Sequence, residues 1–216
     1  MINKEFTKRF ITSFLLLVLL ALMNFYNYIL IIALIIITLI SWIEFNGLVL
    51  KIFNKNNFLK ITLKLLGLLY ISSLSILIMF TKINNPDYIK LIMFPILISI
   101  TSDLGGFFFG KILGGPKLSK ISPNKTIAGS IGSFVFSLML IPIFFQVITD
   151  YSLVKVALFI FIISFVSQTG DLFISYLKRK ANVEDTGDLL PGHGGFLDRI
   201  DGIIFAVPVG FLLFST

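Results

Sequence analysis

The sequence predicts an all-α, polytopic integral membrane protein with about seven transmembrane helices. Composition is the first reason: of the 216 residues, 56% are hydrophobic and 13% are charged, and the mean hydropathy is +0.99. Soluble domains instead hold roughly 45–50% apolar and about 25% charged residues. The second reason is that apolar stretches recur along the whole chain, separated by short polar segments. Together these observations exclude a soluble globular domain.

The first apolar stretch follows a short basic segment. Lys4, Lys8 and Arg9 precede the apolar residues 10–23, a pattern that signal peptides share with first transmembrane helices. A cleaved signal ends in small residues, whereas this stretch ends in Ala-Leu-Met-Asn-Phe and leads at once into another apolar run. We therefore expect a retained first transmembrane helix.

Six further apolar stretches follow this first helix. Two of them, residues 88–100 and 153–166, are short for a full crossing, so we expect tilted or extended helices there. The expected spans are residues 10–23, 28–45, 58–80, 88–100, 127–148, 153–166 and 200–214.

The basic residues indicate the orientation of these spans. With the N-terminus in the cytoplasm, all of the 18 Lys and Arg residues except Lys82, Lys90 and Lys155 fall on the cytoplasmic side. Cytoplasmic loops of membrane proteins carry an excess of Lys and Arg, so orientation accounts for most of the net charge of +7. We therefore expect no nucleic-acid partner. Because the chain has no cysteine, disulfides and thiolate metal sites are excluded.

Two polar segments, residues 101–126 and 168–201, interrupt the hydrophobic pattern on the predicted cytoplasmic side. They hold the only histidine and most of the 11 acidic residues. We therefore expect one integrated membrane domain, with N-terminal transmembrane helices in residues 1–100 and the chemically active region in residues 101–216. The acids and the histidine in these segments are Asp103, Asp171, Glu184, Asp185, Asp188, Asp198, Asp201 and His193.

The first polar segment has the composition of a phosphate-binding region. Its glycines, among them Gly105, Gly106 and Gly110, allow close backbone approach, and its lysines and hydroxyls offer positive charge and hydrogen-bond donors. Residues 105–111 fit G-x-x-x-x-G-K, but Ile112 replaces the Ser or Thr of a P-loop and no strand precedes it. A basic loop against anionic lipid headgroups is the alternative interpretation. The candidate phosphate ligands are Lys111, Lys117, Ser122, Lys125 and Thr126.

The second polar segment begins with a possible helical column of polar residues. If the helix continues past residue 168, Asp171, Ser175 and Lys178 are spaced i, i+4 and i+7 and line one face, with Arg179 next to them. An acid at the membrane edge is costly when unpaired, so Asp171 should face a cavity, a cation or a metal ion.

The rest of this segment predicts a loop followed by a helix. Pro191-Gly192 and Gly194-Gly195 favour a tight exposed loop around His193, and Asp198 and Asp201 then fall in the first turn of a helix. Two acids at a helix start can be caps or dipole partners. Together with Asp171 they are also hard oxygen ligands, which suit Mg²⁺ with phosphate better than Zn²⁺. His193 is either a turn residue or a group that donates to phosphate or acts as an acid.

These residues carry a resemblance to a known family. The pattern Ser175-x-x-Lys178-Arg179, Asp185, Pro191-Gly-His193-Gly-Gly, Asp198-Arg199-x-Asp201 resembles the C-terminal signature of phosphatidate cytidylyltransferases, also called CDP-diacylglycerol synthases. Residues 102–126 are similar to another motif of that family. Three positions depart from it: Glu184, where Lys is common; Ala128, where Glu is common; and Ile174, where Glu is frequent.

The resemblance implies an activity and a set of site residues. It implies a nucleotidyltransferase that condenses CTP with phosphatidic acid to give CDP-diacylglycerol and pyrophosphate, using Mg²⁺ and a second, monovalent cation such as K⁺. It further implies a homodimer in contact with membrane lipid, in a bacterial-type inner (plasma) membrane, with the active site in cytoplasmic-side loops and helices. The implied metal ligands are Asp171, Asp198, Asp201 and Ser175; the implied catalytic groups are these aspartates with Lys178, Arg199 and His193; and the implied nucleotide-binding residues are Lys111, Lys117, Ser122, Lys125, Thr126, Arg179 and Asp185.

Two other functions remain as alternatives. A cation-coupled transporter would use Asp171 to bind the ion, and it predicts acids near the bilayer midplane. A related CTP-dependent lipid kinase, or another nucleotidyltransferase, would differ in whether cytidine enters the lipid product.

Overall fold

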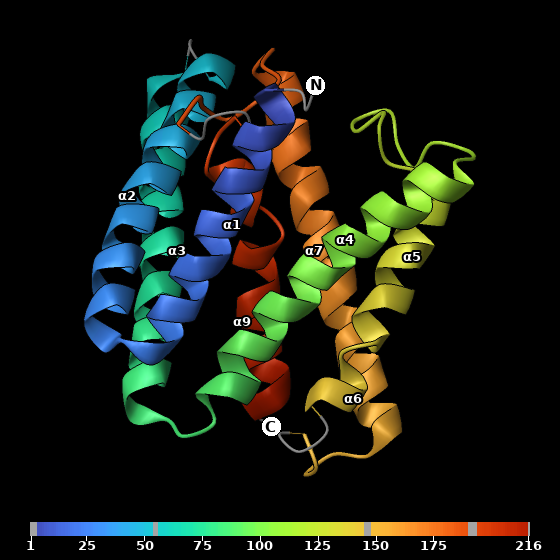
Figure 1. Cartoon of the computed structure of the whole chain (residues 1–216). Helices are drawn as coiled ribbons and strands as arrows, with labels where there is room; N and C mark the ends of the chain where they lie inside the picture. The colour runs from blue at the N-terminus through green and yellow to red at the C-terminus, as the bar shows by residue number, and fades with distance from the viewer. Residues whose placement is uncertain (1–3, 54–55, 145–147, 190–193, 216) are drawn as a thin grey trace. The chain divides into compact units, whose positions relative to one another are not determined.

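The computed structural model describes residues 4–53, 56–144, 148–189 and 194–215, and every regular element within them is helical. An isolated β-bridge pairs Lys117 with Thr126. The predicted all-α class is therefore confirmed (Figure 1). The described elements are α1 (Lys4–Phe25), α2 (Asn27–Ile52), α3 (Asn57–Asn84), the π-helix η1 (Ile89–Met93), α4 (Phe94–Leu113), α5 (Ile127–Leu138), α6 (Ile141–Phe144), α7 (Leu153–Lys180), α8 (Leu197–Ile200) and α9 (Ile203–Ser215).

Five of the described helical stretches are long and apolar enough to cross a membrane. The chain is therefore a polytopic integral membrane protein, as predicted. The two outer elements of the expected seven are not among these five: α1 contributes the shorter apolar part Phe14–Phe25, and α9 has 13 residues. The five stretches are Asn27–Ile52, Asn57–Asn84, Ile89–Leu113, Ile127–Phe144 and Leu153–Lys180.

Two of these helices extend further than hydrophobicity predicts. Apolar patterning placed their ends near residues 100 and 166, but α4 continues to Leu113 and α7 to Lys180. The extension of α4 tolerates polar residues because their hydroxyls donate to backbone carbonyls of the same helix. Thr101 Oγ1, for example, donates to Leu97 O at 2.8 Å. Each helix is followed by a left-handed residue, Gly114 (φ 60°) after α4 and Asn182 (φ 55°) after α7. The first half of each polar segment is thus helical.

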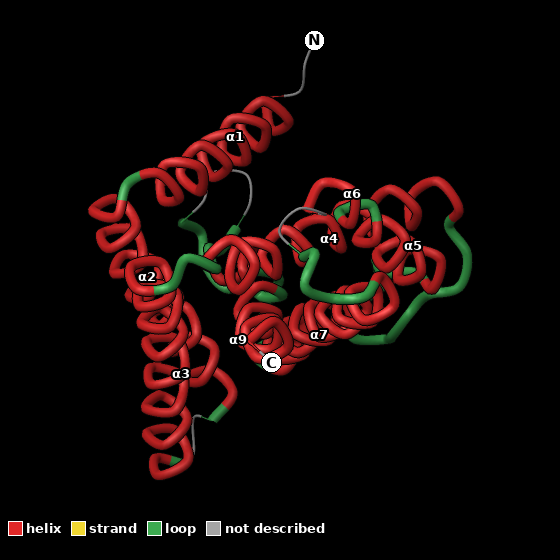
Figure 2. Tube along the Cα trace, turned by 90° about the horizontal axis from the view of Figure 1, so that it is seen from below, coloured by secondary structure: helices red, strands yellow, loops and turns green. Residues whose placement is uncertain are grey.

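The chain divides into two compact units, and the first consists of Met1–Asn84 and Leu177–Ile200. Within it, α2 packs side by side with α3 (Figures 1 and 2). Trp42 Nε1 of α2 donates to Lys64 O of α3 at 3.3 Å. Both α1 and the short α8 also contact α2. Helix α2 is therefore the common support of this unit.

The second unit consists of Asn85–Tyr176 and Asp201–Thr216. Its closest helix pair is α4 with α5, where glycines face backbone. A Cβ on Gly105 would lie 2.5 Å from Gly132 O, and one on Gly129 would lie 2.7 Å from Gly106 O. Small residues allow such close packing of membrane helices. Gly105 and Gly106 therefore serve helix packing, and the expected approach of their backbone to a phosphate stays a prediction.

Hydroxyl pairs connect α7 to the other helices of the second unit. Ser99 and Ser167 are 2.7 Å apart at their Oγ atoms, and Ser102 and Ser164 are 2.9 Å apart. These buried contacts join α4 to α7, and Ser130 of α5 donates to Gln168 Oε1 of α7 at 2.6 Å. Hydrogen bonds of this kind fix neighbouring helices where apolar packing alone is weakly directional. They set the position of α7 immediately before Asp171.

The two units follow from packing. The expected division into residues 1–100 and 101–216 follows instead from where the polar motifs lie in the sequence. That division stays a prediction.

Candidate functional site

Asp171 in the second unit is paired with a lysine from the loop before α5. Lys125 Nζ donates to Asp171 Oδ2. Ser175, one turn further along α7, donates to Asp171 Oδ1 at 3.4 Å. The predicted helical column therefore exists, and its acid and hydroxyl are in contact. Each carboxylate oxygen of Asp171 thus accepts from one side chain, and Lys125 neutralises its charge.

The loop that supplies Lys125 is closed by its own backbone. Leu118 N donates to Lys125 O at 2.8 Å, and Ile127 N donates to Pro116 O at 3.0 Å. Thr126 caps α5, because its side chain accepts a hydrogen bond from Gly129 N at 3.0 Å. These bonds hold Lys125 at the start of α5. The structure thus gives Thr126 a role as a helix cap, while its predicted contact with nucleotide stays a prediction.

Asp198 is the centre of a second cluster, which lies in the first unit. Lys178 Nζ donates to Asp198 Oδ1 at 2.6 Å, and the Asp198 side chain is only 6% exposed. Thr186 N and Gly195 N donate to Asp198 Oδ2 at 2.8 and 3.2 Å, and Thr186 Oγ1 lies 2.9 Å from the same oxygen. Buried charges are tolerated when they are paired and hydrogen-bonded in this way. The carboxylate of Asp198 is therefore held in one orientation.

Glu44 of α2 also belongs to this cluster, and the sequence analysis missed it. Its carboxylate accepts hydrogen bonds from Thr186 Oγ1 at 2.8 Å and from Phe196 N and Leu197 N at 2.9 and 2.8 Å. A signal for it was present, because Glu44 is an acid near the end of an apolar span. Thr186 had no such signal, since a threonine in a polar loop is ordinary.

The helix expected to carry both Asp198 and Asp201 is interrupted. Helix α8 ends at Ile200, Asp201 and Gly202 form a turn, and α9 begins at Ile203. That part of the prediction is wrong because Asp201 is buried in the turn, where its Oδ1 accepts Gly202 N at 2.8 Å. The turn packs on α7, since a Cβ on Gly170 would lie 2.9 Å from Asp201 O. The second unit thus places Asp201 beside the residue that precedes Asp171.

The other predicted ligands are mostly exposed. Lys111 sits on α4 with its Nζ 5.7 Å from the centroid of the Phe107 ring, and neither Lys117 nor Lys120 forms an ion pair with any described residue. Ser122 lies in the closed loop and is half-buried. His193 lies outside the described residues. Among the charged residues of the second polar segment that the predictions single out, Arg179, Glu184, Asp185 and Arg199 are exposed.

The carboxylates have the chemistry of a magnesium site, but the described residues do not form a complete one. Oxygen ligands are what Mg²⁺ prefers. Within the part of the chain that the structure describes, no three His, Cys, Asp or Glu residues are close enough to hold a metal ion. Asp171 and Asp201 belong to one unit and Asp198 to the other. A shared metal site therefore stays a prediction.

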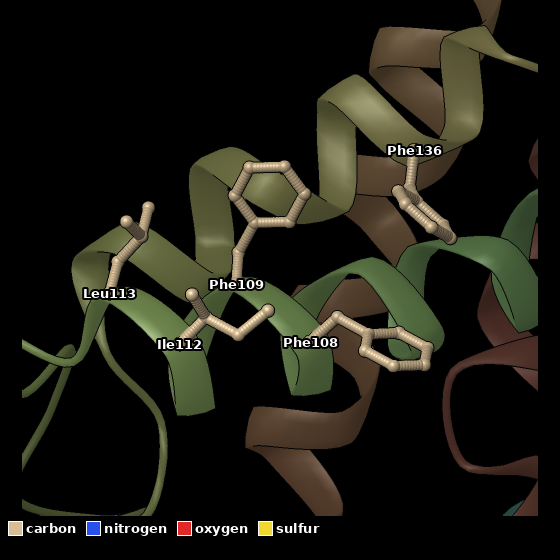
Figure 3. Close-up of a pocket in the computed structure, with 5 residues that line it drawn as sticks. All are labelled: Phe108, Phe109, Ile112, Leu113 and Phe136. Atoms are coloured by element: carbon tan, nitrogen blue, oxygen red, sulfur yellow. The ribbon is translucent and has the colours of Figure 1, made fainter.

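A cavity of about 360 Å³ lies against α4 and α5 in the second unit. It is lined entirely by apolar side chains, with Phe136 from α5 and the others from α4 (Figure 3). Because it offers no charge or hydrogen-bond donor from these side chains, it does not suit a triphosphate. The lining residues are Phe108, Phe109, Ile112, Leu113 and Phe136.

Fold and site together define a class: a polytopic membrane protein with a buried or partly buried aspartate–lysine pair in each of its two units. Comparison with known proteins narrows this class. The model of the cytidylyltransferase family matches residues 1–216. The chain belongs to the cytidylyltransferase family.

Three curated relatives bear the name phosphatidate cytidylyltransferase. The protein of Bacillus subtilis strain 168 is 39% identical over 141 residues, which are 63% of this chain and 52% of the relative. That of Staphylococcus saprophyticus is 34% identical over 159 residues, 72% of this chain and 60% of the relative. That of Rickettsia bellii is 40% identical over 160 residues, 69% of this chain and 68% of the relative. The chain thus spans little more than half the length of the first two.

Proposed function

We propose that this protein is a phosphatidate cytidylyltransferase, which transfers the cytidylyl group of CTP to phosphatidic acid in phospholipid biosynthesis. The observation that carries the proposal is the family match over the whole chain, together with relatives of that name at 34–40% identity. The two aspartate–lysine clusters support it, because they combine anionic and cationic groups of the kind that phosphoryl transfer requires.

The proposed reaction needs no dedicated base. A phosphate oxygen of phosphatidic acid is already anionic, so it attacks the α-phosphorus of CTP directly. The bond between the α-phosphorus and the bridging oxygen to the β-phosphate breaks, and pyrophosphate leaves with that electron pair. The protein must overcome charge repulsion and stabilise the leaving group. Lys178 and Arg199 are proposed for this role, and His193 as a donor to phosphate.

The nucleotide is proposed to bind through residues of both polar segments. Lysine and hydroxyl side chains would contact the triphosphate, and CTP would arrive from the cytoplasm while the lipid substrate enters from the leaflet. The proposed nucleotide-binding residues are Lys111, Lys117, Ser122, Lys125, Thr126, Arg179 and Asp185.

A divalent metal ion, Mg²⁺, completes the proposal. Asp171, Asp198 and Asp201, with Ser175, would hold it, and K⁺ is proposed as a second cation. When bound, the metal would neutralise charge on the reacting phosphates. The ammonium groups of Lys125 and Lys178 lie on the carboxylates of Asp171 and Asp198, so each lysine neutralises an acid that would face the metal ion when it is bound. The oxygen donors of these side chains are of the kind that Mg²⁺ prefers.

The orientation and assembly are also parts of the proposal. The excess of basic residues on one side of the predicted transmembrane spans supports a cytoplasmic N-terminus and a cytoplasmic site in a bacterial inner membrane. The family resemblance supports a homodimer.

A transfer assay with two positions of label tests the activity. Purified protein in detergent is incubated with Mg²⁺ and CTP labelled at the α-phosphate or, separately, at the γ-phosphate, with phosphatidic acid or diacylglycerol as acceptor. We expect α-label to enter lipid with phosphatidic acid only, and γ-label to stay in the aqueous phase. Entry of γ-label into diacylglycerol would identify a lipid kinase instead. Entry of neither label would contradict both functions.

A further inference from the structure

Glu44 is an acidic side chain that the proposed chemistry does not use. It lies in α2, is 7% exposed, and was expected to be part of an apolar span. Its Oε1 accepts Phe196 N at 2.9 Å, and its Oε2 accepts Leu197 N and Thr186 Oγ1, each at 2.8 Å. Every one of these residues belongs to the first unit. A buried carboxylate with three donors is a stable arrangement, and it ties α2 to the start of α8.

Glycines make room for this contact. A Cβ on Gly187 would lie 2.7 Å from Glu44 Oε1, and one on Gly195 would lie 2.7 Å from Glu44 Oε2. Both positions would clash with the carboxylate if they carried a side chain. The absence of side chains at Gly187 and Gly195 therefore leaves room for the Glu44 carboxylate.

Thr186 links Glu44 to Asp198. Its hydroxyl is 2.8 Å from Glu44 Oε2 and 2.9 Å from Asp198 Oδ2. A hydroxyl has a single hydrogen and donates to only one carboxylate at a time. Thr186 therefore lies between the two carboxylates, with its hydroxyl within hydrogen-bond distance of both.

We propose that Glu44 is a positioning residue for the proposed reaction: it holds Thr186 and the first turn of α8 so that the Asp198 carboxylate is fixed in its reactive orientation. This proposal rests on the proposed function, because that function is what makes one orientation of the Asp198 carboxylate reactive. Helix α8 has only four residues, which is too short to be stable by itself. A carboxylate from α2 supplies the acceptors that its first amides need.

Glu44→Gln is the sharpest variant, because it keeps the shape of the side chain. Whichever way the amide is turned, its NH₂ group faces the amide of Phe196 or Leu197, so one hydrogen bond is lost. Ser41→Ala is the matched control, one turn earlier on α2. Ser41 is 0% exposed, and its hydroxyl has no hydrogen-bond partner among the described residues.

The experiment combines steady-state kinetics with hydrogen–deuterium exchange on the full protein in detergent. In Glu44→Gln we expect kcat to fall about 10–100-fold, as for loss of residues that orient metal ligands, with the KM values for CTP and phosphatidic acid nearly unchanged. We expect the amides of Phe196 and Leu197 to exchange about tenfold faster, because their local structure opens more easily. Ser41→Ala should match the wild type in both measurements.

Thr186→Val keeps the experiment decisive if Glu44→Gln folds poorly. It removes the link to Asp198 but leaves both backbone bonds of Glu44, so kcat should fall while exchange at residues 196–197 stays as in the wild type. If the wild type is active and either Glu44→Gln or Thr186→Val has the same kcat, the positioning role is overturned. The proposed function then still stands. A wild type that transfers no cytidylyl group would overturn the function, and the positioning role with it.

Discussion

Asp198 and Asp171, the two aspartates at the centre of the proposal, are held in different ways. Asp198 is 6% exposed and is bound by Lys178, by Thr186 and by the amide of Gly195. Asp171 is 19% exposed, and two side chains bind its carboxylate, those of Lys125 and Ser175. Asp198 is thus fixed largely by backbone, whereas Asp171 is held by side chains that can rotate.

The difference indicates two kinds of carboxylate within one proposed reaction. Backbone amides cannot move without moving the chain, so the Asp198 cluster is preorganised and needs little rearrangement when charge develops. Lys125 lies on a surface loop beside a partly exposed acid, so this pair can adjust when a nucleotide binds. Substitutions in the Asp198 cluster should therefore affect stability and activity together, and those around Asp171 mainly activity.

The largest effect on stability is expected from Asp198→Asn. It leaves Lys178 buried without its anion and places an NH₂ group opposite backbone donors, so we expect a loss of about 3 kcal/mol in the free energy of unfolding. Asp171→Asn should cost less than about 1 kcal/mol, because that pair is partly exposed. Unfolding followed by the fluorescence of Trp42, the single tryptophan, measures both. Equal losses would show that the two acids are not held differently.

Lys178→Met should have the next largest effect. The carboxylate of Asp198 stays buried, but the backbone amides of Thr186 and Gly195 at Oδ2 offset part of the missing charge, so we expect about 2 kcal/mol of destabilisation. Transfer should fall at least about 100-fold, because Lys178 is also proposed to stabilise the leaving group. The same unfolding measurement and the lipid-label assay test this. Wild-type stability in this variant would mean that the lysine does not support Asp198.

Lys125→Met should mainly reduce transfer. Its ion pair with Asp171 is partly exposed, so the loss of stability should be no more than about 1 kcal/mol. The loop that carries it is closed by backbone hydrogen bonds, which the substitution leaves in place. We expect about a tenfold loss of transfer, equal to roughly 1.4 kcal/mol in the barrier. If Lys125→Met lost more stability than Lys178→Met, the Asp171 pair would be the more important of the two for stability, contrary to this account.

Lys117→Ala should have the smallest effect. This lysine is exposed and forms no ion pair among the described residues. If it attracts the triphosphate, the KM for CTP should rise by a factor of about two to five at low salt, and the difference should shrink at high salt through screening. Stability should not change. An unchanged KM at low ionic strength would remove Lys117 from the nucleotide-binding set.

The sequence predicted the column on α7 because helical periodicity alone decides which residues share a face. Asp171, Ser175 and Lys178 do lie on one continuous helix, and Ser175 does contact Asp171. The partners of the two aspartates were not predictable, since Lys125 lies 46 residues from Asp171 and pairing at that separation depends on the tertiary fold. The interruption at Asp201-Gly202 was missed for the same reason: a buried turn forms there because it packs on α7.

Two other features were present in the sequence but were interpreted too narrowly. Gly106 and Gly110 have the four-residue spacing typical of closely packed membrane helices. The glycine-rich segment therefore predicts helix packing as well as phosphate binding. Glu44 is an acid in an apolar span, which is by itself an indication of function or of a buried partner. Attention to charges inside the spans, as well as between them, would have identified it.

The most direct test of the central claim is cytidylyl transfer by the wild type, Asp171→Asn and Asp198→Asn, measured side by side with α-labelled CTP and phosphatidic acid, with and without Mg²⁺. We predict transfer by the wild type only with Mg²⁺, and a loss of about 1000-fold in both variants, equal to roughly 4 kcal/mol of transition-state stabilisation. Asp171→Asn should lose this activity while retaining its stability. Either variant keeping more than about a tenth of wild-type transfer would contradict the claim that both carboxylates act in the reaction.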